Sequence, residues 1–182
     1  MRHSVEIIDV TYANVCPCTG CVTCSYEGPC VQKGGMETLR KRILDADMLI
    51  FATPLHYHGI TVQFKMAVGR FCAFSSSLHA KHMASALIVD AWNSSDWTFD
   101  ASNAHYKTLV RYLNFQDKGE TLGYGCGAPG MTKRSRYVKQ AREFGRNLKQ
   151  ETIKGVIEYG NVSRIFFFNQ ERKHRTCSSF LS

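Results

Sequence analysis

A continuous apolar run, Met48-Leu49-Ile50-Phe51-Ala52, constrains the fold of this chain more than any other feature. The run is short, Thr53-Pro54 ends it, and no polar residue alternates with the apolar ones. Such a strand is buried on both faces, which is typical of the centre of a parallel sheet. Because parallel strands need long crossover connections, we expect a helix on either side of this run.

Strand-like and helix-like segments alternate along the rest of the chain. We predict strands at 5–10, 48–52, 84–91, 121–126 and 164–168, and helices at 36–46, 61–74, 102–115 and 132–150. This alternation predicts an α/β fold, a doubly wound parallel sheet with helices on both faces. No repeat, low-complexity tract or linker interrupts it, so we expect residues 1–182 to form a single domain.

The net charge of +8 is concentrated in the last third of the chain. Residues 1–131 hold 11 Lys/Arg and 11 Asp/Glu, whereas residues 132–182 hold 12 Lys/Arg and four acidic residues. A basic segment can bind nucleic acid, but no nucleic-acid motif accompanies this one. We interpret it as the solvated face of a helix that carries Lys133, Arg134, Lys139, Arg142, Arg146 and Lys149.

Neither a membrane span nor a secretion signal is visible. No apolar run approaches the roughly 20 residues that a membrane helix needs. The first residues, Met-Arg-His-Ser-Val-Glu, lack the apolar core of a signal peptide. We therefore expect a cytoplasmic protein that does not contact a membrane.

Five of the eight cysteines fall within fifteen residues, with the spacing Cys18-x2-Cys21-x2-Cys24-x5-Cys30 preceded by Cys16. In a reducing compartment this clustering favours metal or redox chemistry over disulfides. Four thiolates on one loop can hold a [4Fe–4S] cluster, the interpretation that we favour, or a zinc ion. The remaining alternative is a loop lined by small buried thiols. Cys16 has no place in the pattern, and Cys72, Cys126 and Cys177 are scattered.

Three loops are predicted at one edge of the sheet. Ligands of doubly wound sheets bind at the carboxyl ends of the strands. The cysteine loop follows the first strand, residues 54–59 follow the second, and a glycine-rich turn at 123–130 follows a later one. We therefore expect most of the unusual residues to lie on one rim.

Further motif residues accompany the cysteines: Met36, Ala46-Asp47, Thr53-Pro54-Leu55-His56-Tyr57, Thr61, Lys65 and Arg70. Over about residues 5–150 the combination resembles the NADPH-dependent FMN reductases of the flavodoxin superfamily, and among them the iron–sulfur flavoproteins. Two positions depart from that pattern. Gly34-Gly35 stands where those proteins have an acidic pair, and Gly69 replaces the aspartate before Arg70.

The resemblance implies a flavodoxin-like fold and bound FMN. Its isoalloxazine ring would pack on the loop formed by Pro54, Leu55, His56, Tyr57, His58 and Gly59. The resemblance also implies an FMN-dependent oxidoreductase or electron-transfer protein, linked to NAD(P)H or to the cluster, with a small-molecule or protein redox partner, in a homo-oligomer. The flavin would perform the chemistry, so no catalytic side chain is assigned.

Proteins of that family open with a strand and a phosphate loop, and this sequence begins at the strand that would follow them. The C-terminal segment 164–182 is similar to that opening in order and spacing. We hypothesise a permuted arrangement in which strand 164–168, in cis or from a neighbouring chain, lies between strands 5–10 and 47–53. Asn169, Arg172, Thr176 and Ser178 would then bind the FMN phosphate. The alternative is a hydrophobic tail that packs on the surface or is disordered.

Two other functions remain open. The chain fits a flavodoxin-like module without FMN that acts as a binding or metal-holding protein. It also fits an enzyme in which Cys126, in the glycine-rich turn, is a nucleophile paired with a histidine.

Overall fold

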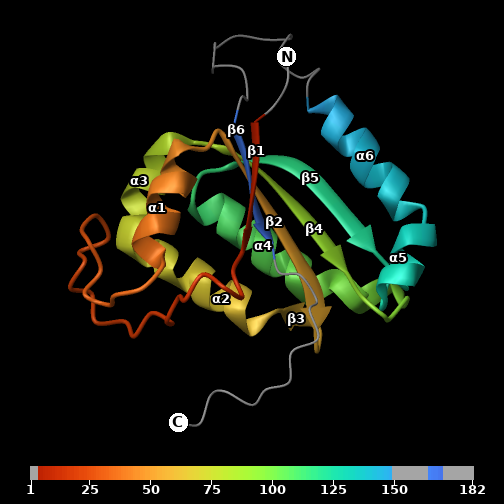
Figure 1. Cartoon of the computed structure of the whole chain (residues 1–182), viewed down its shortest axis with the longest axis horizontal. Coiled ribbons are helices and arrows are strands. Elements are labelled where there is room, and N and C mark those ends of the chain that lie inside the picture. The colour runs from red at the N-terminus through yellow and green to blue at the C-terminus, as the bar shows by residue number, and fades with distance from the viewer. Residues whose placement is uncertain (1–3, 149–163, 170–182) are drawn as a thin grey trace.

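A computed structural model describes residues 4–148 and 164–169 of the chain (Figure 1). Strands and helices alternate, as the sequence predicts. In chain order the elements are β1 (Ser4–Asp9), α1 (Met36–Asp45), β2 (Met48–His56), β3 (Gly59–Ile60), α2 (Val62–Gly69), η1 (Arg70–Phe74), α3 (Ser75–Lys81), β4 (Ala84–Asp90), η2 (Asp96–Phe99), α4 (Asp100–Tyr112), β5 (Gln116–Gly123), α5 (Pro129–Arg134), α6 (Tyr137–Asn147) and β6 (Arg164–Asn169).

Five of the strands form a parallel sheet in the order β1-β6-β2-β4-β5. The short strand β3 pairs antiparallel with the end of β2 and makes a hairpin. Helices join β1 to β2, β2 to β4 and β4 to β5, so the fold is the flavodoxin-like α/β fold that the sequence predicts. No described helix has the length and apolar character needed to cross a membrane.

β6 lies between β1 and β2 and pairs with both. Phe167 is opposite Ile7 on one side and Ile50 on the other. The described strand comes from the same chain, so the place that the permutation hypothesis assigns to it is filled in cis. Through β6, backbone groups of β1 and β2 that would otherwise face a gap take part in the sheet.

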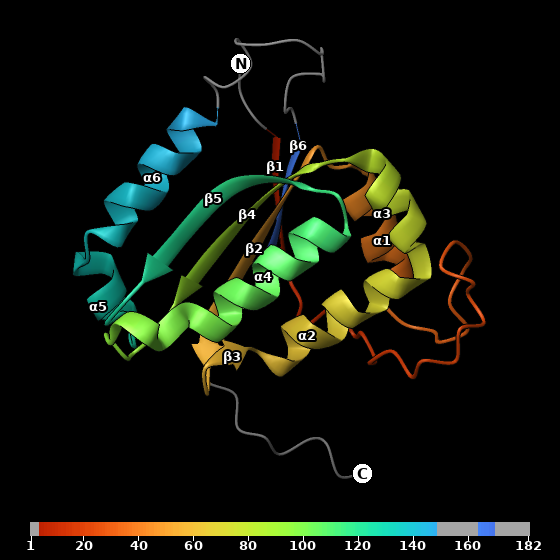
Figure 2. The ribbon, with the colours of Figure 1, turned by 180° about the vertical axis from the view of Figure 1, so that it is seen from behind.

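Side chains of β2 alternate between two cores. Leu49 and Phe51 point to the larger one, which is built from α1, α2, α3 and α4 on one face of the sheet (Figure 2). Met48 and Ile50 point to the other face, where Phe144 and Leu148 from the region of α6 pack against them. Burial on both faces explains why the run from 48 to 52 is apolar at every position.

Three predicted elements differ from the structure. The helix predicted at 61–74 is interrupted, because α2 ends at Gly69 and a 3-10 turn precedes α3. The helix predicted at 132–150 is split at Ser135, which has extended backbone. The strand predicted at 121–126 starts earlier, at Gln116, because β5 is a polar, partly exposed edge strand that has no apolar run to reveal it.

Candidate functional site

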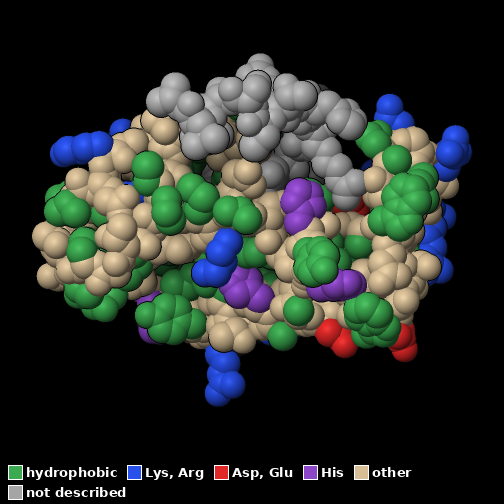
Figure 3. Space-filling view, turned by 90° about the horizontal axis from the view of Figure 1, so that it is seen from below, with side chains coloured by type: hydrophobic (Ala, Val, Ile, Leu, Met, Phe, Trp, Pro, Cys, Tyr) green, Lys and Arg blue, Asp and Glu red, His purple; other side chains and the backbone are tan. Residues whose placement is uncertain are grey.

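The carboxyl ends of the parallel strands meet at one edge of the sheet, the lower edge in Figure 1. Figure 3 views this edge directly. Histidine side chains lie among hydrophobic ones near the middle of the face, and the acidic side chains in view are confined to one side of it. The edge therefore offers an apolar and aromatic surface with little negative charge near its centre, which suits a planar anionic ligand.

A tight hairpin projects from this edge. His56 pairs with Gly59, so only Tyr57 and His58 form the loop. Both have positive φ, 50° and 63°. Two-residue hairpin loops of this geometry strongly prefer Asn and Gly, because other side chains are strained there. The hairpin thus keeps two bulky side chains at positions that disfavour them, and Tyr57 is fully exposed.

The predicted loop 54–59 divides into an anchored part and an exposed part. Pro54 is buried in β2, in register with Asp90, and Leu55 pairs with Ile60. Three side chains in the middle of the predicted loop, those of His56, Tyr57 and His58, are exposed. The hydroxyls of Thr53 and Thr61, both buried, lie 3.5 Å apart and tie the base of the hairpin to the start of α2. The base of the hairpin is therefore anchored in the fold, whereas its loop is exposed.

Two tryptophans that the sequence analysis did not select also lie at this edge. Trp97 packs against His58, with ring centroids 4.9 Å apart and the two rings tilted by 33°. Trp92 packs over Gly127, where an added Cβ would lie 2.0 Å from an indole carbon. The glycine-rich turn thus accommodates an indole ring. Next to it, Cys126 is only 1% exposed, and a thiol so buried is typical of a structural cysteine.

The residues predicted to bind phosphate are only partly described. Asn169 is the last residue of β6 and lies level with Ala52 and Asp9. β6 therefore ends at the same edge as the hairpin. Arg172, Thr176 and Ser178 lie outside the described residues.

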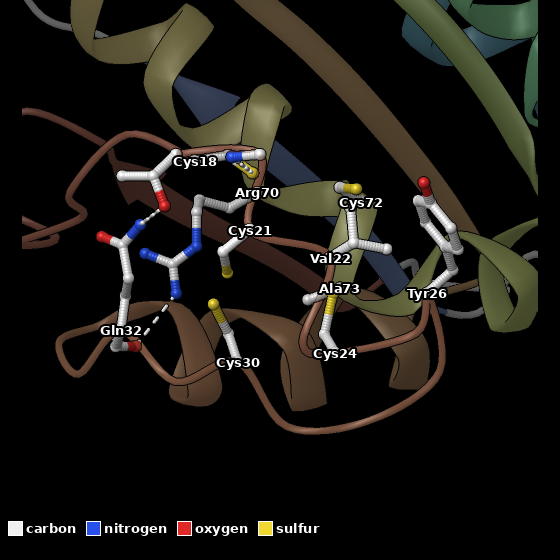
Figure 4. A pocket seen from close by; sticks show the side chains of 12 residues that line it. Cys18, Cys21, Val22, Cys24, Tyr26, Cys30, Gln32, Arg70, Cys72 and Ala73 are labelled. Atoms are coloured by element: carbon white, nitrogen blue, oxygen red, sulfur yellow. Dashed lines mark hydrogen bonds between the residues drawn. The ribbon is translucent and has the colours of Figure 1, made fainter.

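The cysteine loop encloses a second feature, a pocket of about 220 Å³ (Figure 4). The pocket brings together the four cysteines that the spacing selects, and it adds Cys72 and Arg70 from η1. Its lining comprises Cys18, Thr19, Gly20, Cys21, Val22, Cys24, Tyr26, Cys30, Gln32, Arg70, Cys72 and Ala73. Cys72 is not predicted from the cysteine spacing, although its place two residues after the motif residue Arg70 is a signal for it.

Backbone turns wind the cysteine loop around the pocket. Val22, Ser25 and Tyr26 all have positive φ. The amide of Ser25 donates to the carbonyl of Val22, and that of Gly28 donates to the carbonyl of Cys24 at 2.7 Å. These tight turns bring the regularly spaced cysteines to the lining of one pocket, although a β-branched residue such as Val22 is strained in this conformation.

The thiols of the pocket differ in their surroundings. The Gly20 amide lies 3.4 Å from the sulfur of Cys18 and donates to it. Hydrogen bonds from the side chain and backbone of Thr23 lower the pKa of the Cys21 thiol, which favours the thiolate that ligates metal. Burial raises the pKa of Cys72, and the neighbouring thiols of Cys18 and Cys24 raise it further. The thiols of Cys18 and Cys24 therefore lie near that of Cys72.

The donor set suits a cluster with one thiolate per iron. Among residues 4–148 and 164–169, no three Cys, His, Asp or Glu side chains converge closely enough to hold a single metal ion. A [4Fe–4S] cluster instead needs thiolates distributed around a volume, one at each corner. All seven described cysteines are free, and four with suitable spacing surround one pocket beside the buried guanidinium of Arg70. The residues fit such a group.

Close packing explains one departure from the motif pattern. An added Cβ on Gly35 would lie 1.7 Å from the carbonyl oxygen of Ala13, and one on Gly34 would lie 2.6 Å from that of Asn14. Gly34 also has a positive φ of 125°. Side chains are excluded here, so the acidic pair has no room beside the chain that follows β1.

The family model for NADPH-dependent FMN reductase matches residues 1–116. The chain belongs to this family. The match covers β1, the cysteine loop, the hairpin and α4, so both features described above lie within the matched residues.

Among members with related sequences, an iron–sulfur flavoprotein of Archaeoglobus fulgidus is 33% identical over 70 residues, 38% of this chain and 32% of that protein. Another, from Methanocaldococcus jannaschii, is 31% identical over 65 residues, 36% of this chain and 34% of that protein. The matched part thus spans about a third of the length of these relatives. The Trp repressor binding protein from Bacillus subtilis shares the fold, with a TM-score of 0.52 and 18% identity over 60% of this chain and 70% of its own.

Proposed function

We propose that this chain is an FMN-dependent oxidoreductase that holds the flavin at the hairpin edge and a [4Fe–4S] cluster in the cysteine pocket. One observation carries the proposal. α2 begins at Val62, directly behind the hairpin, and ends at Gly69, directly before Arg70 of the pocket. Eight helical residues span about 12 Å. The two features are therefore connected by one short helix, which is buried at Phe64, Ala67 and Val68.

At the flavin site, the residues that we assign are those of the hairpin and its neighbours. The exposed residues His56, Tyr57 and His58 offer backbone amides to the ring edge, and Tyr57 offers an aromatic face. Trp97, packed against His58, widens that surface. Asn169 together with Arg172, Thr176 and Ser178 is proposed for the phosphate. When bound, FMN supplies both hydride and single-electron chemistry, and the protein orients it and excludes water.

In the cysteine pocket, the proposed ligands are Cys18, Cys21, Cys24 and Cys30. Amide and hydroxyl donors at Gly20 and Thr23 stabilise the thiolate forms. Cys72 lies beside Cys18 and Cys24 but is placed outside the ligand set, because it does not belong to the regular spacing. A cluster in this pocket supplies single-electron transfer.

Further parts of the proposal concern the redox partners and the cell. NAD(P)H is the proposed electron donor, and a small molecule or a protein is the proposed acceptor. We also propose a homo-oligomer in the cytoplasm. Steady-state oxidation of NADPH and NADH by the FMN-loaded protein, and light scattering of the same sample, test these points.

The decisive experiment is anaerobic purification followed by a visible spectrum and by analysis of iron, sulfide and zinc. We expect flavin absorption after FMN is added and a broad brown band with iron and acid-labile sulfide. A colourless protein that cannot be reconstituted with FMN would overturn the proposal in favour of a module that lacks the flavin. Stoichiometric zinc without iron would overturn the cluster alone.

Serine variants test the ligand assignment. Cys18→Ser, Cys21→Ser, Cys24→Ser and Cys30→Ser should each lose most of the iron. Cys72→Ser is the matched control, because this thiol lines the same pocket, and it should retain the iron of the parent chain. If Cys72→Ser loses as much iron as Cys18→Ser, Cys72 is a ligand and the assignment is wrong.

A further inference from the structure

Arg70 is a charged side chain buried almost completely, with 1% of its surface exposed. It is the first residue of η1 and lines the cysteine pocket. Nη1 donates to the carbonyl of Cys16 at 2.9 Å. Nη2 donates to that of Gln32 at 3.1 Å (Figure 4). These two carbonyls lie at opposite ends of the cysteine loop. The guanidinium therefore clamps both ends of the loop onto η1.

The positive charge of Arg70 has no counter-charge among the described residues. No described carboxylate forms an ion pair with it, and its Nε, which is also buried, has no hydrogen-bond partner there. An arginine stays protonated at any physiological pH. Burial of an unpaired charge is costly, and a protein keeps such a charge where an anion is bound or where the charge has a function.

The pocket itself indicates which anion this is. Carboxylates are absent from its lining, whereas five cysteines are present. In Figure 4 the thiols of Cys21 and Cys30 point toward the same space, which the Arg70 guanidinium adjoins. Thiols become thiolates when they ligate iron, so a loaded pocket gains several negative charges next to this cation.

We propose that Arg70 is the resident counter-charge of the cysteine pocket, which holds the loop closed and raises the midpoint potential of the cluster. This inference rests on the proposed cluster. Reduction adds one electron to a group that is already anionic, and a fixed positive charge beside it stabilises the reduced form more than the oxidised form. Arg70 is thus a positioning and potential-tuning residue rather than a ligand.

Two substitutions distinguish the role of the Arg70 hydrogen bonds, which hold the loop closed, from the role of its positive charge. Arg70→Gln removes the charge and keeps a donor for one of the two carbonyls. Arg70→Lys keeps the charge but lacks the planar fork that reaches both. Lys81→Gln is the matched control, because Lys81 also donates to a backbone carbonyl, that of Leu44 at 2.6 Å, and does not line the pocket.

The test uses reconstituted full-length protein under anaerobic conditions. Iron and sulfide are counted, the midpoint potential is measured by a redox titration followed by electron paramagnetic resonance, and the rate of iron loss to a chelator is recorded. Arg70→Gln should have a more negative potential than the parent. Arg70→Lys should keep the parent potential but lose iron about tenfold faster, as is usual when a partner outside the ligand set is changed. Lys81→Gln should match the parent in all three measurements.

Every other outcome of this test either supports or overturns the proposal. Loss of the cluster in Arg70→Gln alone, with Arg70→Lys loaded, shows that assembly needs the charge and supports the proposal. A loaded Arg70→Gln at the parent potential overturns it. So does equal loss of the cluster in both variants, because Arg70 is then only a clamp. If the parent chain takes up no iron, the proposed cluster is wrong, and the proposed role of Arg70 is then wrong as well.

Discussion

Tyr57 and His58 occupy the positive-φ loop of the hairpin although neither is suited to it. Strained backbone conformations cost stability. Residues that keep them are therefore concentrated at functional sites, where the strained conformation is needed. Tyr57 is fully exposed, so its side chain contributes no packing to the fold. The reason for keeping a tyrosine there must lie in what binds to it, which is consistent with the proposed contact to the flavin.

Tyr57→Asn should therefore stabilise the apo chain and weaken FMN binding. We expect unfolding to cost about 0.5 to 1 kcal/mol more, since Asn tolerates positive φ. FMN affinity should fall about threefold to tenfold through loss of an aromatic contact. Urea unfolding and fluorescence titration with FMN measure the two effects. Tyr112→Asn, at an exposed tyrosine of α4, should leave FMN affinity unchanged. An unaltered affinity in Tyr57→Asn would remove Tyr57 from the site.

Gly35→Ala tests the close approach behind the cysteine loop. The added methyl group would collide with the carbonyl oxygen of Ala13, so we expect a loss of about 2 kcal/mol or more in unfolding free energy. Gly69→Ala is the matched control, because no atom lies within 4 Å of the added Cβ. It should be neutral or stabilise by up to about 1 kcal/mol. Equal stability of the two variants, measured by chemical denaturation, would contradict the packing argument.

The spacing in the sequence identifies the four clustered cysteines, because successive tight turns in one loop bring residues that are near in sequence together in space. It does not reveal Cys72 or the counter-charge role of Arg70. Both reach the pocket only because η1 packs against a loop about forty residues earlier in the chain. Trp97 was not predicted for the same reason. Its contact with His58 joins η2 to the hairpin, and these two segments are far apart in the sequence.

At the scale of elements, a polar cluster joins α4 to the edge strand β5. The carboxylate of Asp117 accepts hydrogen bonds from Lys107 at 2.9 Å, from the Gly119 amide at 2.9 Å and from the Tyr106 hydroxyl at 3.1 Å. Burial alone would raise the pKa of Asp117, but these hydrogen bonds outweigh it and lower the pKa. Burial raises the pKa of Tyr106, so its hydroxyl remains a donor. The start of β5 at Gln116 was not predicted from the sequence, because polar residues form this part of the strand.

Asp117→Asn should destabilise the chain by about 1 kcal/mol at neutral pH, a value discounted for the exposure of the carboxylate. The pKa of Asp117 is lower in the folded chain than the roughly 3.9 of an unfolded aspartate. The stabilisation is therefore present above about pH 4 and is lost as the pH falls through the folded pKa, so the variant and the parent should converge in acid. Chemical denaturation between neutral and acidic pH measures this difference.

Asp45→Asn, at the exposed end of α1, serves as the control for that series. It should stay within about 0.5 kcal/mol of the parent at every pH. A difference between Asp117→Asn and the parent that does not change with pH would show that the carboxylate charge is irrelevant to the joint between α4 and β5.

For the whole molecule, the central feature is the strand β6, which pairs with β1 and β2 at once. The order of elements was predictable because a buried parallel strand has an apolar sequence, and both 48–52 and 164–168 have one. The edge strand and the helix breaks were less predictable, since polar composition and local turns do not reveal tertiary contacts. The phosphate-binding role assigned to Arg172, Thr176 and Ser178 stays a prediction.

Two truncations distinguish the strand from the segment that follows it. Deletion of residues 164–182 should abolish cooperative unfolding, because the sheet loses a strand from its interior, and a peptide of residues 164–182 should restore it. Deletion of residues 170–182 alone should keep the fold. It should reduce affinity for FMN at least about tenfold and leave that for riboflavin, which has no phosphate, unchanged. Equal losses for both ligands would place the phosphate elsewhere.

The position of β6 also bears on how the chain is made. On the ribosome, β1 and β2 emerge more than a hundred residues before the strand that separates them in the sheet. Until then the two strands have no partner between them, and pairing directly with each other would give a wrong register. Such distant pairing is slow and leaves strand edges exposed to other chains. The nascent protein should therefore depend on chaperones throughout its synthesis, and it should complete its sheet only when residues 164–169 have emerged.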